Sequence, residues 1–180
     1  MLKFQKITPG EYKLVKDQLV NSFKLQKFET IIAPFEIILA VGKWKEVLLV
    51  TDQLSRVFQE FKDYRNPYAM GIHFGDITRN KFRISLEGIT LIAKHVEEKT
   101  ILTDSGEKKV LYRRDLTKED LQYIPPSIQK NDLSILTNEN GEVLALGKYL
   151  INLDEIKTSS RNRKIVKNII DKGWYLRKGK

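Results

Sequence analysis

The chain has 180 residues, 41% of them hydrophobic, and carries a formal net charge of +9 at pH 7. This length suits one large domain or two small ones with a buried core, and the sequence has no run of about 18 apolar residues that would span a membrane. The absence of cysteine excludes disulfides, thiol nucleophiles and thiolate metal sites. Because the first residues, MLKFQKITPGEYK, contain no apolar signal core, we expect a cytoplasmic protein.

The excess positive charge is concentrated near the C-terminus. Residues 1–98 carry 15 basic and 12 acidic residues, residues 99–156 carry 8 and 10, and residues 157–180 carry 9 and 1. A general enrichment in lysine would raise the isoelectric point without this clustering. A concentrated basic segment favours a polyanionic partner, above all nucleic acid, because binding releases condensed counterions.

The first part of the chain is predicted to mix helices and strands. Residues 11–23, EYKLVKDQLVNSF, repeat apolar side chains at helical spacing. The next stretch, FETIIAPFEIILAVGKWKEVLLVT, contains short apolar runs split by Pro34 and Gly42, as is typical of strands joined by tight turns. Residues 52–64, DQLSRVFQEFKDY, are predicted to form a helix with Asp52 as its N-cap.

The region around residues 70–96 is predicted to contain turns, a strand and a helix, in that order. Turns are indicated at Gly71, Gly75 and Asp76, and KFRIS is predicted to be a strand. The apolar spacing of LEGITLIAKHV predicts a helix.

Short β-rich units predominate from about residue 99. The segments KTILTD, KKVLYR, DLSILTN and EVLALGKYLI are predicted strands, separated by turn signals such as DSGE and NENG. NENG, between two apolar runs, indicates a hairpin. DLTKEDLQYI is predicted to be a short helix in which Thr117 and Asp120 form a capping pair. Several short strands at regular spacing indicate a small barrel.

The final stretch, SSRNRKIVKNIIDKGWYLRKGK, alternates basic and large apolar residues. A disordered tail would be poor in large apolar residues, so we predict a packed strand, a turn at Gly173 and a closing strand GWYLR. Strand alternation would place Trp174 and Leu176 on one face and Tyr175 and Arg177 on the other. We expect Trp174 in the core, whereas Tyr175 is equally compatible with the core and with stacking on a base.

Several segments resemble a known family of RNA-binding proteins. The segments KKVLYRRDL, NDLSILTNENGEVLALGKYLI and DKGWYLRKG resemble the PUA domain, an RNA-binding pseudobarrel. The stretch GIHFGDITRNKFRISLEGITLIA is similar to the glycine-rich turn and Lys-Phe-Arg strand of the Nip-seven family of ribosome-biogenesis proteins. The resemblance spans residues 50–180, and WYLRKG and KFRISLEGITLIA are its most specific parts.

Two positions depart from the PUA pattern. Arg113 follows the tyrosine where that pattern usually has glycine, and Asn131 precedes Asp132 where it usually has Gly-Asp. Asparagine tolerates a left-handed backbone well. Arg113 would either cover part of the RNA groove or add a phosphate contact.

The resemblance implies a fold class of α+β, with an N-terminal α/β pre-PUA domain over residues 1–97 and a C-terminal PUA-like β pseudobarrel over residues 98–180. It also implies a non-catalytic RNA-binding role in large-subunit biogenesis and pre-rRNA processing, with a leaning to uridine-rich single strands. Ribosome-assembly factors and the RNA-degrading exosome are partners inherited from the family. We expect a monomer that needs no cofactor and contacts no membrane.

The candidate RNA-binding residues are basic or aromatic and lie mostly in the last 24 residues. They are Arg161, Arg163, Lys164, Lys167, Lys172, Tyr175, Arg177, Lys178, Arg113 and Arg114. Arg79, Lys81 and Arg83 alternate along a predicted strand and form a possible accessory RNA contact, although a solvated strand face explains them equally well.

Other functions have less support in the sequence. The only histidines, His73 and His95, have no second ligand at metal spacing, so no zinc site is predicted. GIHFGD lacks the Lys-Ser/Thr of a phosphate-binding loop, and no carboxylate carries a catalytic motif. Two alternatives remain open: a protein-interaction adaptor with a basic surface, and a non-catalytic part of an RNA-modification or exosome-linked complex. A third, an RNA-modifying enzyme with an appended PUA domain, lacks a cofactor fingerprint.

Overall fold

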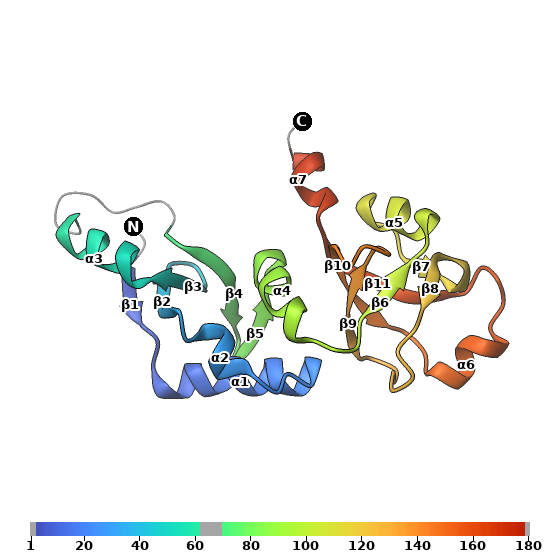
Figure 1. The fold of residues 1–180 in the computed structure, drawn as a ribbon, viewed down its shortest axis with the longest axis horizontal. Helices are drawn as coiled ribbons and strands as arrows, with labels where there is room; N and C mark the ends of the chain where they lie inside the picture. The colour runs from blue at the N-terminus through green and yellow to red at the C-terminus, as the bar shows by residue number, and fades with distance from the viewer. Residues whose placement is uncertain (1–2, 62–69, 179–180) are drawn as a thin grey trace. The chain divides into compact units, whose positions relative to one another are not determined.

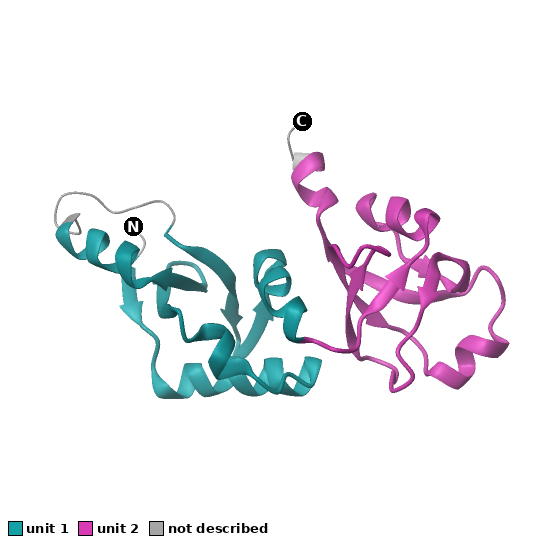
Figure 2. Ribbon diagram, viewed as in Figure 1, with its two compact units in different colours: residues 1–95 teal, residues 96–180 magenta. Residues whose placement is uncertain are grey.

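The chain folds into two compact units, residues 1–95 and residues 96–180, and each contains one sheet (Figures 1 and 2). The computed structural model describes residues 3–61 and 70–178. Within that part of the chain, no helix is both long and apolar enough to cross a membrane.

The first unit is built on a five-stranded antiparallel meander in which spatial order equals chain order. Helix α3 contacts β2 and β3, α4 contacts β4, and α1 contacts β5 (Figure 1). The elements are β1 (Lys3–Lys6), α1 (Pro9–Phe23), α2 (Phe28–Ile32), β2 (Phe35–Val41), β3 (Lys45–Thr51), α3 (Asp52–Phe61), β4 (Ile72–Thr78), β5 (Lys81–Ile84), α4 (Leu86–Ile92) and a 3₁₀ turn (Ala93–His95).

Apolar runs account for the central strands of this sheet. Strands β2 and β3 each contain four consecutive buried residues, which is the pattern of a strand covered on both faces. One core cluster contains Ile38, Leu48 and Val50, with Phe4 and Phe58 packed against it. The predicted helices over 11–23 and 86–96 and the strand KFRIS are confirmed by α1, α4 and β5.

Two local predictions in this unit are wrong. FETII forms α2 instead of a strand, because Phe28, Ile31 and Ile32 are buried on one helical face. Gly75 and Asp76 lie inside β4 instead of in a turn. A Cβ at Gly75 would lie 2.3 Å from the carbonyl oxygen of Arg83, so this glycine permits a close approach of strands.

The predicted helix from Asp52 is confirmed over Asp52–Phe61, and its remainder, residues 62–64, lies outside the described residues. Its N-cap falls one residue earlier than predicted. The hydroxyl of Thr51 accepts a hydrogen bond from the backbone N–H of Leu54 at 3.4 Å, which is the geometry of a Thr cap.

The second unit contains a six-stranded mixed sheet in the order β7-β11-β10-β9-β6-β8. The spatial order of the strands differs from their chain order and the β6–β9 pair is parallel, so this sheet is not a meander. It forms the predicted pseudobarrel. The elements are β6 (Thr100–Leu102), α5 (Asp104–Leu111), β7 (Leu116–Thr117), a 3₁₀ turn (Lys118–Asp120), β8 (Leu121–Tyr123), β9 (Leu133–Thr137), β10 (Val143–Tyr149), α6 (Leu153–Thr158), β11 (Lys164–Asp171) and α7 (Gly173–Lys178).

Apolar side chains and one polar network fill the pseudobarrel. Leu116, Leu136 and Ile165 belong to its core cluster and are fully buried. The hydroxyl of Tyr149, also fully buried, lies 2.7 Å from Thr100 Oγ1. This hydrogen bond satisfies a phenol that would otherwise be costly to bury.

The hairpin at NENG is confirmed, since β9 and β10 pair antiparallel on either side of it. The capping pair of Thr117 and Asp120 is also confirmed, but it closes a single 3₁₀ turn between two short strands instead of the predicted helix.

The predicted turn DSGE and strand KKVLYR are wrong, because residues 104–111 form α5 and the last two residues of KKVLYR lie in the turn after it. Thr103 caps the helix by accepting a hydrogen bond from the N–H of Gly106 at 3.2 Å. Gly106 and Val110 are buried four residues apart, which is helical spacing. The predicted closing strand GWYLR is also wrong and forms the short helix α7.

Candidate nucleic-acid interface

Three segments of the second unit meet at the C-terminal end of α5. The side-chain amide of Asn168 in β11 donates to the carbonyl oxygen of Val110 at 2.8 Å. The backbone N–H of Asn168 donates to Oδ1 of Asp115 at 3.1 Å. From α7, Arg177 donates to the carbonyl oxygen of Leu111. Exposed residues that directly follow α5 or lie on α7 form what we call the α5–α7 corner: Tyr112, Arg113, Arg114, Trp174 and Tyr175.

Arg113 occupies a backbone position that favours glycine. Its φ is 61°, in the left-handed region, directly after α5, and Asn131 has a φ of 78°. Both departures from the PUA pattern therefore keep the backbone that glycine would adopt. Asparagine tolerates this conformation, but arginine adopts it at a cost. Strain of this kind persists where the surrounding structure supports it, often at functional sites.

Three of the predicted RNA-binding cations that are exposed already have acidic partners. Arg161 pairs with Glu119, Arg163 Nη2 lies 3.1 Å from Glu155 Oε2, and Lys164 Nζ lies 3.0 Å from Asp115 Oδ2. All three acids come from the 99–156 segment, whose net charge is negative. The positive charge that is concentrated in the sequence is thus partly neutralised in the fold. Exposed pairs such as these contribute about 0–1 kcal/mol each, and each carboxylate has to be displaced before its cation can contact a phosphate.

Several other cations of the second unit have no ion pair among residues 3–61 and 70–178 of the structure. They include Arg113, Arg114, Lys167 and Lys148. Lys148 was not among the predicted site residues. It lies directly opposite Lys167 in the β10–β11 pair, and only the strand register reveals this. Like charges at opposed positions are unfavourable unless an anion lies between them, so the pair favours a polyanionic ligand.

Arg177 is partly buried and pairs with a buried acid. Its Nη1 donates to Oδ1 of Asp171 at 2.9 Å and its Nη2 donates to Oδ2 of the same residue at 3.2 Å. The side chain of Asp171 is only 2% exposed. A buried carboxylate requires such a partner, so the structure gives Arg177 the role of fixing α7 to β11 instead of a free phosphate contact.

The remaining C-terminal candidates lie around α7. Lys172 follows β11 and is half-buried, with its backbone N–H donating to the carbonyl oxygen of Leu144 at 2.9 Å. Tyr175 is 51% exposed and Trp174 is 42% exposed, so the prediction that Trp174 lies in the core is wrong. A helix, unlike the predicted strand, turns this side chain outward. Lys178 ends α7, and its side chain lies outside the described residues.

The possible accessory residues lie on the β4–β5 hairpin of the first unit. Arg79 is in the turn and not on the strand, and both it and Asn80 have positive φ, 51° and 57°, as in a type I′ turn. Lys81 and Arg83 are exposed on β5, with Phe82 buried between them, so the predicted alternation is correct for these two residues.

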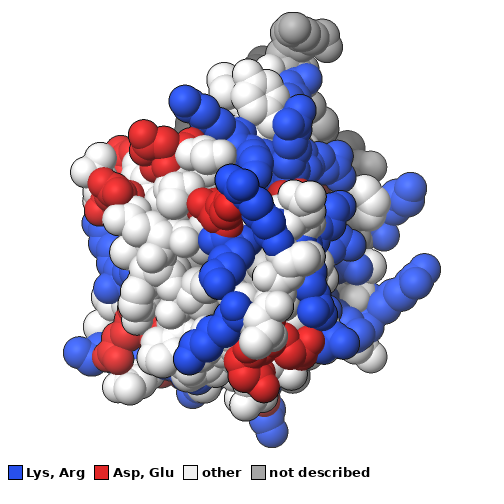
Figure 3. Space-filling model, turned by 90° about the vertical axis from the view of Figure 1, so that its right-hand side faces the viewer, with Lys and Arg blue, Asp and Glu red and all other residues white. Residues whose placement is uncertain are grey.

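Basic side chains also gather on one face of the molecule (Figure 3). Figure 3 shows one face of the molecule with Lys and Arg side chains over its centre and right-hand side, and acidic side chains mainly at its left and lower margins. A continuous field of one sign steers an anionic ligand toward a surface.

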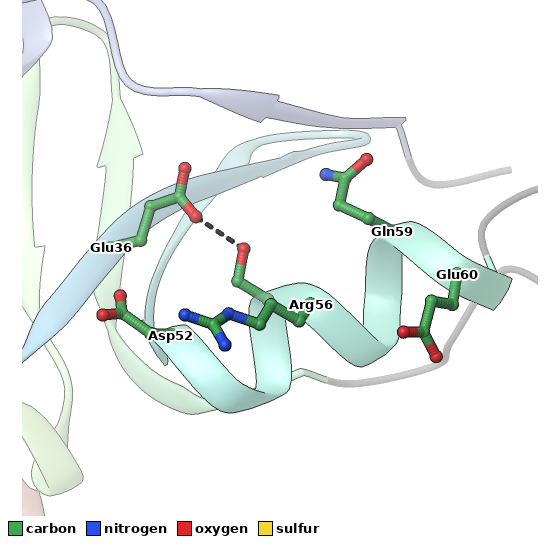
Figure 4. A pocket seen from close by; sticks show the side chains of 6 residues that line it. Glu36, Asp52, Arg56, Gln59 and Glu60 are labelled. Carbon is green, nitrogen blue, oxygen red and sulfur yellow. Dashed lines mark hydrogen bonds between the residues drawn. The ribbon is translucent and has the colours of Figure 1, made fainter.

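A hollow of about 450 Å³ in the first unit lies beside α3 (Figure 4). Glu36 in its wall accepts a hydrogen bond from Ser55 Oγ at 2.6 Å and lies 3.2 Å from Lys6 Nζ. The Ser55 hydrogen bond lowers the pKa of Glu36, which makes this carboxylate a weak base. No group of three or more His, Asp or Glu side chains in the described part of the chain could hold a metal ion.

The comparisons with known proteins agree with this architecture. Residues 98–180 match the family described as UPF0113 PUA domain, and residues 4–86 match the family described as NIP7/UPF0113, pre-PUA domain. Fold and matches together define a PUA-class protein, in which a pre-PUA unit precedes a PUA pseudobarrel. The chain belongs to the NIP7/UPF0113 family, which confirms the resemblance seen in the sequence.

Relatives and solved structures share this arrangement. A UPF0113 protein of Archaeoglobus fulgidus is 27% identical over 143 residues, 79% of each chain. A UPF0113 protein of Aeropyrum pernix is 29% identical over 179 residues, covering 96% of this chain and 90% of the relative. The structure of a conserved PUA domain protein from Thermoplasma acidophilum matches with a TM-score of 0.63 at 14% identity, over 98% of this chain and 99% of that one. At this identity the structural match shows the fold.

Proposed function

We propose that the protein is a non-catalytic RNA-binding factor that acts in large-subunit biogenesis and pre-rRNA processing. Its PUA domain, residues 98–180, binds single-stranded, uridine-rich RNA, and its pre-PUA domain, residues 1–97, orients the RNA or binds an assembly factor. Membership of the NIP7/UPF0113 family supports this proposal. It acts without a cofactor, as a monomer in the cytoplasm.

One observation carries the proposal: Arg113 and Arg114, which have no ion pair among the described residues, directly follow Tyr112 at the end of α5, where α7 with its exposed rings packs. Arg113 and Arg114 precede Asp115, which is hydrogen-bonded to the strand beside Lys167. A cation without an acidic partner can bind a phosphate without first giving up an ion pair, because its charge is already available. We therefore place the main phosphate contacts on these three residues and Lys148.

Two variants with the same net charge test this placement. One replaces Arg113, Arg114 and Lys167 by alanine, and the other replaces Arg161, Arg163 and Lys164 by alanine. Each lowers the formal net charge by three. Binding of uridine-rich and cytidine-rich single-stranded RNA is measured across a salt series for both variants and the unaltered protein.

The first variant is expected to lose most of the affinity, and the slope of log K against log salt should fall by about 2, since each phosphate contact on a single strand contributes about 0.7. The second should bind nearly as well as the unaltered protein. The reverse ranking would move the site to the paired cations. Failure of the unaltered protein to bind RNA at moderate salt would refute the proposed function and favour an adaptor.

A further inference from the structure

Exposed aromatic side chains concentrate at the same place as the unpaired cations. The second unit exposes six large hydrophobic side chains, and five of them lie on the turn after α5, on β11 or on α7. Their exposed fractions run from 42% to 76%, and they are Tyr112, Ile169, Trp174, Tyr175 and Leu176. Large contiguous apolar surface on a soluble protein usually marks a binding site.

The rings are mounted on a firmly held element. The bidentate pair between Arg177 and buried Asp171 fixes one end of α7. At the other end, a Cβ on Gly173 would lie 1.9 Å from the carbonyl oxygen of Leu111, so only glycine permits this approach to α5. Rings held in this way need little ordering when a ligand binds, which reduces the entropy cost of association.

We propose that Tyr112 and the Trp174–Tyr175 pair form a platform on which unpaired RNA bases stack, while Arg113, Arg114 and Lys167 hold the adjoining phosphates. This inference rests on the proposed function and adds that the protein recognises the faces of unpaired bases. The Trp174 and Tyr175 rings meet edge to face, with centroids 5.2 Å apart and an interplanar angle of 86°. Aromatic side chains on a basic surface are the usual means of binding single strands, since every base has a π-face.

Charge excludes a second copy of the chain as the occupant. A self-complementary interface would bring two sets of these cations together, and like charges in an interface are strongly unfavourable. A double helix also fits poorly, because its bases are already stacked on one another and present only their edges and backbone. A single strand meets both requirements, since it has exposed base faces and a negative backbone.

The test uses the two tryptophans, of which Trp44 lies in the first unit and Trp174 in the second. In the full chain with Trp44→Phe, fluorescence reports Trp174 alone. This protein is titrated with a uridine-rich single strand and with an abasic strand of the same length, which keeps the phosphates and lacks the bases. Stacking should quench Trp174 with the first strand only.

Affinity measurements on tyrosine variants complete the test. Tyr112→Ala and Tyr175→Ala should each weaken binding of the uridine-rich strand about 10-fold and leave binding of the abasic strand unchanged. Tyr112→Phe and Tyr175→Phe keep the ring and should bind like the unaltered protein, and circular dichroism checks that every variant is folded.

The outcomes separate this inference from the proposed function. If the unaltered protein binds both strands equally, with a steep salt dependence, RNA binding holds and the platform is refuted. If the alanine variants lose affinity for both strands alike, the tyrosines act through the fold and the platform is again refuted. If the unaltered protein binds neither strand, the proposed function fails.

Discussion

Replacing Arg113 by glycine separates the backbone role of this position from the role of its charge. The left-handed φ of 61° costs an L-residue about 1–2 kcal/mol. Glycine avoids this cost, but it loses more backbone freedom on folding than other residues, which offsets about 0.5–1 kcal/mol of the gain. The net stabilisation of Arg113→Gly is therefore about 0.5–1 kcal/mol. For a unit of this size it corresponds to a rise in Tm of about 2–8 °C.

The matched control is Arg113→Ala, which removes the same charge and keeps the Cβ. It should leave the stability near that of the unaltered protein. Thermal unfolding is followed through Trp174 in a Trp44→Phe background, so that the signal comes from the second unit alone. Equal stability of the glycine and alanine variants would show that no strain is stored at this turn.

The same two variants also test whether Arg113 contacts RNA. If the guanidinium of Arg113 contacts a phosphate, both variants should bind single-stranded RNA more weakly, with the salt slope reduced by about 0.7. Arg113→Gly would then be the more stable and the less active protein, the trade-off expected where strain serves function. If the glycine variant binds RNA as well as the unaltered protein, the guanidinium of Arg113 contacts no phosphate.

Four further outcomes are expected. Gly173→Ala should lower stability by about 1–3 kcal/mol in urea titrations followed through Trp174, because its Cβ would lie 1.9 Å from the carbonyl oxygen of Leu111; unchanged emission and midpoint would contradict this packing. Arg177→Gln should lower the free energy of unfolding by about 2–4 kcal/mol, since it leaves the carboxylate of Asp171 buried without a charged partner. The double variant with Asp171→Asn should lose less stability than the sum of the two single variants. Tyr149→Phe should lower the stability of the second unit by about 1–2 kcal/mol through loss of the hydrogen bond to Thr100, and a neutral effect would show that this hydroxyl is dispensable. The hydrogen bond that the His73 ring donates to Asp76 raises the pKa of His73. The contribution of this pair to the stability of the first unit is therefore complete below about pH 6.5 and is lost as the pH rises through the raised value. The pH dependence of stability, followed through Trp44 in a Trp174→Phe protein, should flatten in Asp76→Asn.

Several features could be predicted because they depend on neighbouring residues. The apolar runs of β2 and β3, the NENG hairpin and the capping pair of Thr117 and Asp120 are set by contacts within a few positions of each other. The family resemblance rested on similarly local motifs, such as KFRISLEGITLIA, and predicted the fold class correctly.

Short segments were predicted less well, because their local preferences are weak. KKVLYR and GWYLR contain β-branched and aromatic residues that favour strands, yet residues 108–111 lie in α5 and GWYLR lies in α7. Propensity differences of a few tenths of a kcal/mol per residue are outweighed by burial of one core side chain such as Val110.

The sequence by itself determined the chemistry available: a basic chain without cysteine, with a C-terminal segment rich in cations and aromatic rings. The tertiary structure decided which of those groups meet. It paired Arg161, Arg163 and Lys164 with acids from a separate segment and set Arg177 on Asp171. It also left Arg113, Arg114 and Lys167 without an ion pair among the residues that the structure describes. Charges far apart in the sequence neutralise each other only after folding, because the screened Coulomb interaction acts over a few ångströms in space and not along the chain.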